Sequence, residues 1–312
     1  MYYGFDIGGT KIEFSVYDLD LNCVFNDRTP APKHDYGQLL GILSDYVINA
    51  DKTFNCKGLV GIGYPGVLDA VANTLICPNL PSLHGQNLQH DLKQRLDRII
   101  SVQNDANCFL LSECYKGAAE QANVALAVTL GTGLGGAVCI NKQIVNGKNA
   151  SAGEFGHMAI PGNMIQRHPE LPVTFCGCGG QSCLETYCSG TGLAALYKDY
   201  KILLDGSCSE EQALQGPDII TAFENKEAVA EKVIDVYLDI LAAAVGNLIM
   251  LFDPDAIVFG GGLAKFSEIY KQLPERVSHY TFTNMQLPSL NMAQFGGEGG
   301  VRGAALLNYQ AE

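Results

Sequence analysis

Three cysteines are crowded into one short, glycine-rich segment of the chain: Cys176, Cys178 and Cys183. Thiolates at this spacing are ligands that a tetrahedral Zn²⁺ site uses, and a fourth ligand must come from a nearby segment. His157, His168 and Cys188 are the candidates for that fourth position. The alternatives are a disulfide or a reduced thiol cluster. Both fit a cytoplasmic chain poorly, since adjacent thiolates without a metal repel one another and oxidise.

Composition narrows the class of protein. The opening MYYGFDIGG has no basic region followed by a long apolar core, so we expect no signal peptide and read the 11 cysteines as reduced thiols in a cytoplasmic chain. The net charge of −13 and the lack of a basic run argue against nucleic-acid binding. The apolar stretch 240–252 carries Asn247 and is too short to span a bilayer, so no membrane partner is expected.

Two glycine-rich turns follow strands and share one plan, in FDIGGTKIEFSVYD (5–18) and VTLGTGLGGAVCIN (128–141). Each is either a tight turn or a cradle whose backbone N–H groups and Thr hydroxyl bind phosphate. Gly131, Gly133 and Gly136 formally match a dinucleotide fingerprint, but that fingerprint needs a helix directly after the turn. A β-branched hairpin follows instead, so a nicotinamide-dependent oxidoreductase is disfavoured.

The two turns belong to an alternation of strands and helices that begins again in mid-chain. Strands are predicted at 2–7, 12–18, 56–66, 98–104, 123–130, 137–140, 142–147 and 256–259, and helices at 36–51, 105–118, 226–252 and beyond the GGG turn at 260–262. The repeated strand–turn–strand plan predicts two related halves joined near 117–123.

Five short blocks together resemble one family. DIGGTK (6–11), LGTGLGG (130–136) and FGGG (259–262) are similar to the phosphate-1, phosphate-2 and adenosine elements of the actin-like ATPase superfamily. GEFGH (153–157) and CGCGGQSCLE (176–185) resemble the signature of its ROK family of sugar kinases. The resemblance implies an α/β fold of two actin-like (ribonuclease H-like) domains with a nucleotide and sugar cleft between them.

The same resemblance implies the domains and the reaction. A small domain of residues 1–118 plus 300–312 and a larger domain of 119–299 with the zinc loop are expected. The expected reaction is phosphorylation of the amino sugar N-acetyl-D-glucosamine on its 6-hydroxyl by MgATP, in a homodimer. Glucose, N-acetylmannosamine and fructose remain alternative substrates. A sugar-sensing regulator is less favoured, because the chain opens on its first strand with no helix-turn-helix segment before it.

The family pattern also implies roles for individual residues. Asp105 would be the catalytic base, although from the residues alone the favoured role is that of a helix N-cap. The expected sugar-binding residues are Gly66, Asn79, Asn104, Asp105, Glu154, His157 and Glu185. The expected ATP and Mg²⁺ residues are Asp6, Gly8, Gly9, Thr10, Lys11, Gly131, Thr132, Gly133, Gly135, Gly260, Gly261 and Gly262. The expected structural Zn²⁺ ligands are His157, Cys176, Cys178 and Cys183.

Overall fold

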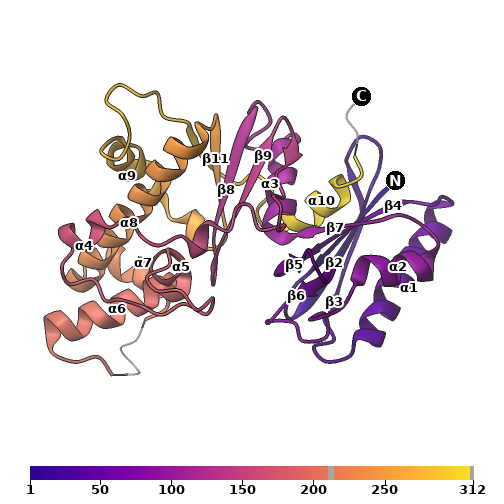
Figure 1. Ribbon diagram of the computed structural model, residues 1–312, viewed down its shortest axis with the longest axis horizontal. Coiled ribbons are helices and arrows are strands. Elements are labelled where there is room, and N and C mark those ends of the chain that lie inside the picture. Colours follow the sequence, from indigo (N-terminus) through magenta and orange to yellow (C-terminus); the bar gives the residue numbers. More distant parts are fainter. Residues whose placement is uncertain (210–213, 310–312) are drawn as a thin grey trace. The chain divides into compact units, whose positions relative to one another are not determined.

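The computed structural model describes residues 1–209 and 214–309 and is drawn in Figure 1. The chain forms two compact units. Unit 1 contains Met1–Glu120, Val138–Ala152 and the described residues from Gln294 onward, and unit 2 contains Gln121–Ala137 and Gly153–Ala293. The chain therefore passes between the units four times, after residues 120, 137, 152 and 293.

The sheet of unit 1 has the strand order β3-β2-β1-β4-β7. Its strands are β1 (Tyr2–Ile7), β2 (Lys11–Tyr17), β3 (Cys23–Pro30), β4 (Leu59–Tyr64) and β7 (Ile100–Asn104). β1 pairs antiparallel with β2 and parallel with β4, and β4 pairs parallel with β7. A separate small hairpin consists of β5 (Val67–Asp69) and β6 (Thr74–Ile76).

Helices cover both faces of this sheet. They are α1 (Tyr36–Phe54), α2 (Leu88–Leu96), α3 (Asp105–Cys114) and α10 (Gly299–Leu306). Phe14 of β2 is buried with Leu39 and Leu43 of α1 in the hydrophobic core of one face. On the other face α10 approaches the strands closely, because a Cβ on Gly4 would overlap the carbonyl oxygen of Val301.

The second sheet has the order β10-β9-β8-β11-β12. Its strands are β8 (Val124–Leu130), β9 (Leu134–Ile140), β10 (Gln143–Ile144), β11 (Ala256–Gly260) and β12 (Ser289–Met292). The helices of unit 2 are α4 (Asn163–Arg167), α5 (Glu185–Cys188), α6 (Gly190–Asp205), α7 (Gly216–Glu224), α8 (Ala228–Phe252) and α9 (Ser267–Ser278).

The two sheets repeat one plan. In each, three consecutive strands are neighbours, and a later strand pairs parallel with the first of the three. The Gly/Thr turns connect β1 to β2 and β8 to β9. The prediction of an α/β fold made of two related halves is therefore confirmed.

The apolar segment considered as a membrane span belongs to α8, which is longer than the stretch 240–252. With 25 residues, α8 is the one helix among the described residues that is long and apolar enough to cross a membrane, so shortness alone does not exclude a span. Its most apolar window is 83% buried inside the protein, which is the pattern of a core helix.

The compact units differ from the expected domains at three places. The first segment of unit 1 ends at Glu120 and not at residue 118. Residues 138–152 belong to unit 1, where Gln103 Nε2 donates to Asn146 Oδ1 at 2.7 Å. Unit 1 also resumes at Gln294 and not at 300, because the Glu113 carboxylate accepts the backbone N–H groups of Gln294 and Phe295 at 3.1 and 3.0 Å. Such long-range hydrogen bonds leave no trace in the local sequence pattern.

Candidate active site and metal centre

Asp105 is the first residue of α3, directly after β7. The expectation that Asp105 is the capping residue is wrong: Asn104 is the N-cap, and its side-chain oxygen accepts the N–H of Ala106 at 2.8 Å and of Asn107 at 3.4 Å. Asp105 Oδ1 also accepts the N–H of Ala106, at 2.8 Å, but the helix does not depend on that bond. Asp105 is exposed to solvent as a residue, and its carboxylate is not needed to cap the helix.

Asn104 also ties a second predicted sugar-binding segment to the start of α3. Its side-chain Nδ2 donates to the carbonyl of Gly66 at 2.8 Å. Gly66 has a φ of +115°, and a Cβ there would overlap the carbonyl oxygen of Ile76, so the backbone itself requires glycine. Asn79 lies beside the first Gly/Thr turn, since its carbonyl oxygen is 3.3 Å from where a Cβ of Gly9 would stand.

Asp6 ends β1 in a crowded and acidic part of unit 1. A Cβ on Gly300 of α10 would lie 2.6 Å from its Oδ2. Burial, followed by repulsion from Asp105 and Glu13, raises the pKa of Asp6 to about 7. Desolvation by the surrounding protein also raises the pKa of the Asp105 carboxyl, although the residue as a whole is exposed to solvent. Carboxylates that repel one another in this way form a local negative charge of the kind that Mg²⁺ offsets.

Lys11 contacts a carboxylate of its own strand. Its Nζ donates to Glu13 Oε1 at 2.6 Å, and Arg28 Nε lies 2.9 Å from the same oxygen. The phosphate contact of Lys11 therefore stays a prediction, as do those of Gly8 and Thr10 in the same turn. The Gly8 N–H donates to the Lys11 carbonyl at 2.8 Å and so closes the turn.

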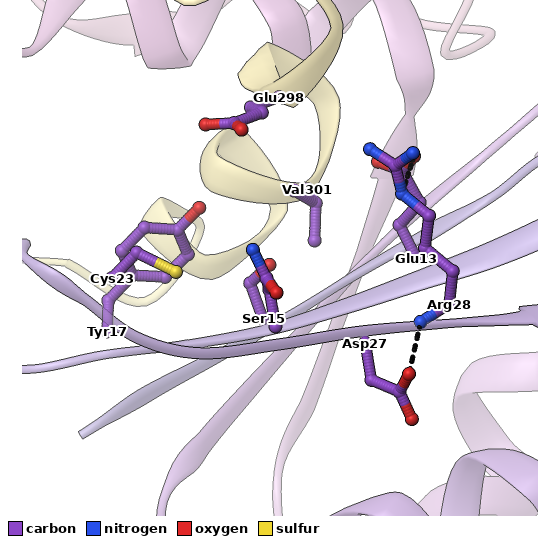
Figure 2. A pocket seen from close by; sticks show the side chains of 9 residues that line it. Glu13, Ser15, Tyr17, Cys23, Asp27, Arg28, Glu298 and Val301 are labelled. Carbon is purple, nitrogen blue, oxygen red and sulfur yellow. Dashed lines mark hydrogen bonds and ion pairs between the residues drawn. The ribbon is translucent and has the colours of Figure 1, made fainter.

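The Glu13–Arg28 ion pair lines a cavity of about 300 Å³ beside α10, shown in Figure 2. Tyr17 and Glu298 are also in its lining, and none of the predicted site residues is. Figure 2 shows that the Asp27 side chain points away from the other lining side chains; its carboxylate accepts the Tyr46 hydroxyl at 2.8 Å. The cavity therefore touches the candidate active site only through Glu13, which pairs with Lys11.

In unit 2 the second Gly/Thr turn is braced by the start of α6. The Gly190 N–H donates to the Gly131 carbonyl at 2.7 Å, and Thr191 Oγ1 donates to the Thr132 carbonyl at 2.9 Å. Sequence reasoning missed Gly190 and Thr191. The signal was Ser189 followed by glycine, since the Ser189 hydroxyl caps α6 by accepting a backbone N–H.

The predicted adenosine turn packs directly on this phosphate turn. Gly261 has a φ of +83°, and a Cβ there would lie 2.5 Å from the Leu130 carbonyl and 2.8 Å from the Gly131 nitrogen. Only glycine accommodates both the backbone conformation and the close approach. The structure thus brings the predicted nucleotide residues 131–133 and 260–262 together within unit 2.

Glu185 connects the same turn to the cysteine loop. Its Oε2 accepts the Leu134 N–H at 2.9 Å, and a Cβ on Gly133 would lie 2.5 Å from that oxygen. Its Oε1 lies 4.0 Å from Cys176 Sγ. The GEFGH segment packs here too, because a Cβ on Gly156 would overlap the Leu134 carbonyl.

The structure brings the four predicted metal ligands together. One ligand atom from each of His157, Cys176, Cys178 and Cys183 lies within 4.8 Å of all the others. His157 Nδ1 is 3.5 Å from Cys176 Sγ, while His157 Nε2 is 4.0 Å from Glu154 Oε2. Cys178 Sγ is 3.6 Å from Cys183 Sγ, and the N–H of Gly180 donates to the Cys178 sulfur and lowers the pKa of that thiol.

The other two candidates for the fourth ligand have partners elsewhere. His168 Nε2 lies 2.7 Å from Asp239 Oδ2, and the buried Cys188 thiol contacts the Tyr237 carbonyl at 4.0 Å. Three sulfurs and one imidazole nitrogen are a donor set that suits the tetrahedral coordination of Zn²⁺.

Comparison with known proteins finds relatives along nearly the whole chain. The chain is 44% identical over 309 residues to the N-acetyl-D-glucosamine kinase of Pectobacterium atrosepticum and 40% identical to that of Escherichia coli O127:H6, with 99% of each chain covered. Among solved structures, a ROK hexokinase from Thermus thermophilus matches with a TM-score of 0.84 at 27% identity, over 98% of this chain and 96% of that one.

A ROK glucokinase from Streptomyces griseus, solved with glucose and AMPPNP, matches with a TM-score of 0.74 at 27% identity over 98% of both chains. A ROK transcriptional regulator at 19% identity shares the fold alone, with a TM-score of 0.80 over 98% of this chain and 77% of the regulator. A model of the ROK family matches residues 2–311, and the chain therefore belongs to the ROK family, with its actin-like ATPase fold.

Proposed function

We propose that the chain is an ATP-dependent kinase that transfers the γ-phosphoryl group of MgATP to the 6-hydroxyl of N-acetyl-D-glucosamine. The observation that carries the chemistry is the Asp105 carboxylate at the start of α3, which Asn104 frees from the capping role. The choice of sugar is supported by relatives of that name at 40–44% identity over nearly the whole chain.

Each unit contributes a part of the machinery that phosphoryl transfer needs. In unit 1, Asp105 accepts the proton of the attacking hydroxyl, and Asn104 and Gly66 orient the sugar. Asp6 acts on the Mg²⁺ side, where its repulsion with Asp105 is relieved by the cation. In unit 2, the N–H groups and hydroxyl of the turn at 131–133 hold the phosphates, and the turn at 260–262 receives the adenosine.

We propose further that His157, Cys176, Cys178 and Cys183 hold one structural Zn²⁺. The close approach of the four ligand atoms supports this. Because His157 Nδ1 faces the sulfurs, its Nε2 is left for a sugar hydroxyl beside Glu154. The metal would keep the loop that carries Glu185 in place. A cytoplasmic location fits the free cysteines of the described residues, and a homodimer is the assembly that we expect.

The experiment that tests the function measures ADP release from MgATP on addition of N-acetyl-D-glucosamine, with phosphorus NMR to locate the new phosphate. We expect sugar-dependent ADP release and a 6-phosphate product, with no absorbance change from added nicotinamide cofactor. Sugar binding without any ADP release would favour a sensing protein and contradict the kinase. A phosphate on a different hydroxyl would contradict the proposed orientation of the sugar.

A further inference from the structure

Glu113, in the last turn of α3, is a fully buried carboxylate at 0% exposure. Three backbone N–H groups donate to it. Oε2 accepts the N–H of Ala118 at 2.9 Å and of Gln294 at 3.1 Å, and Oε1 accepts the N–H of Phe295 at 3.0 Å. The Glu113 carbonyl also accepts the N–H of Ala119 at 3.0 Å. Hydrogen bonds to an ionised acceptor are the stronger kind, so this residue holds two separate segments firmly.

Those two segments are where the chain leaves unit 1 and where it finally returns. Ala118 and Ala119 immediately precede the passage after Glu120, and Gln294 and Phe295 immediately follow the passage after Ala293. Glu113 thus fastens segment 118–119, just before the chain first leaves unit 1, and segment 294–295, just after it last returns, to the same helix. Asp105 is the first residue of that helix, eight residues earlier, or about 12 Å along the axis at the rise of an α-helix.

Arg302 and Gly117 lie close to the Glu113 side chain or to its neighbour Ser112. The Arg302 guanidinium donates to the Ser112 carbonyl at 2.7 Å and lies 3.9 Å from the centre of the Phe295 ring. Gly117 leaves room for the carboxylate, since a Cβ there would lie 2.7 Å from Glu113 Oε2. Although the Glu113 carboxylate is fully buried, three N–H donors satisfy its need for hydrogen bonds.

We propose that Glu113 is a positioning residue for the kinase reaction. It fastens segments 118–119 and 294–295 to α3, so that these two segments move as one body with the helix that presents Asp105. The inference rests on the proposed function, because a base accelerates phosphoryl transfer only when its carboxylate is held in place against the attacking hydroxyl. Misplacement by about 1 Å can lower a rate on the order of 100-fold.

Glu113→Gln is the direct test, because the amide has nearly the same shape. One of its two terminal atoms becomes an NH₂ donor, so at least one of the three backbone N–H groups must lose its acceptor. Hydrogen exchange in peptides covering 115–120 and 293–298 should then accelerate about tenfold or more. Turnover should fall about 10- to 100-fold, while KM for the sugar and for MgATP stays close to the parent values, since neither substrate touches Glu113.

Ser112→Ala is the matched control. Ser112 is the neighbouring residue, is equally buried and also loses a hydrogen bond, the one from Arg302 Nη1 to its Oγ at 3.1 Å. The Ser112 side chain has no hydrogen bond to segment 118–119 or segment 294–295 in the part of the chain that the structure describes. The turnover of Ser112→Ala should therefore stay near that of the parent. Glu113→Asp keeps the buried charge but is one methylene shorter, and it should show the same faster exchange and lower turnover as Glu113→Gln even if the amide variant fails to fold.

The outcomes separate this inference from the proposed function. A parent protein without kinase activity refutes the function, whereas the exchange rates still report whether Glu113 holds both segments. Faster exchange with parental turnover, in whichever variant folds, overturns the positioning role. So does a loss of turnover in Ser112→Ala as large as in the Glu113 variants, because it would show a merely structural contribution. Unchanged exchange in both segments would overturn the anchoring itself.

Discussion

Asp105→Asn removes the proposed base and leaves its setting almost unchanged. Asn104 caps α3 through two backbone N–H groups, and the Ala106 N–H that reaches Asp105 Oδ1 finds an equivalent oxygen in asparagine. The free energy of unfolding should therefore stay within about 1 kcal/mol of the parent. The amide still offers a donor and an acceptor to a sugar hydroxyl, so sugar affinity should survive.

The turnover of Asp105→Asn should fall sharply. A general base contributes about 10² to 10⁴ in rate, equivalent to about 3 to 5 kcal/mol in the barrier. The pKa of Asp105 lies above the usual 3.8. Only the ionised carboxylate can accept the proton of the sugar hydroxyl, so the parent should lose activity as the pH falls through this pKa. Asp105→Asn should lack that acidic limb in whatever activity it keeps.

The assay is ADP release across a pH series, with sugar affinity by calorimetry and a thermal melt of each variant. A turnover within a few-fold of the parent would remove Asp105 from the role of base. A melting temperature several degrees below that of the parent would instead show that the capping assignment to Asn104 is wrong. The lost rate could then come from a disturbed α3.

Three further substitutions test other parts of the account. Cys178→Ser should lower zinc content, measured by elemental analysis, and weaken sugar binding more than MgATP binding, because a hydroxyl is a poor ligand for zinc. In metal-free protein, Asp6→Asn should have a higher melting temperature than the parent at pH 8 and the same melting temperature at pH 4. The pKa of Asp6 is about 7 in the folded protein and ordinarily 3.8, so its ionisation destabilises the fold increasingly as the pH rises between those values. Gly133→Ala should displace the Glu185 carboxylate, 2.5 Å from the new Cβ, and raise KM for the sugar while the melt changes little. An unchanged zinc content, an Asp6→Asn advantage at pH 4, or an unchanged KM would each contradict the corresponding assignment.

Patterns that are local in the sequence predicted most of the elements around the site. The hairpins around both Gly/Thr turns were confirmed, because strand, glycine turn and strand are adjacent in the chain. The close spacing of three cysteines likewise indicated the grouping of thiols that the structure shows. The strand β3 was missed, since seven of its eight residues are exposed and the segment lacks alternating apolar positions.

Features that depend on distant contacts could not be predicted in this way. Asn104 and Asp105 are both good capping residues, and only the end of β7 decides between them. The bracing of Thr132 by Thr191 joins positions 59 residues apart. The bonds from Glu113 to Gln294 and Phe295 join positions more than 180 apart, and no periodicity records them.

The most direct test of the central claim is a competition experiment. The protein and MgATP are incubated with equal concentrations of N-acetyl-D-glucosamine, N-acetylmannosamine, glucose and fructose, and the phosphorylated products are quantified by NMR at low conversion, which compares kcat/KM directly. The account predicts that N-acetyl-D-glucosamine 6-phosphate is the dominant product. Dominance of another sugar phosphate would contradict the proposed substrate while keeping the kinase, and no sugar phosphate at all would contradict the kinase itself.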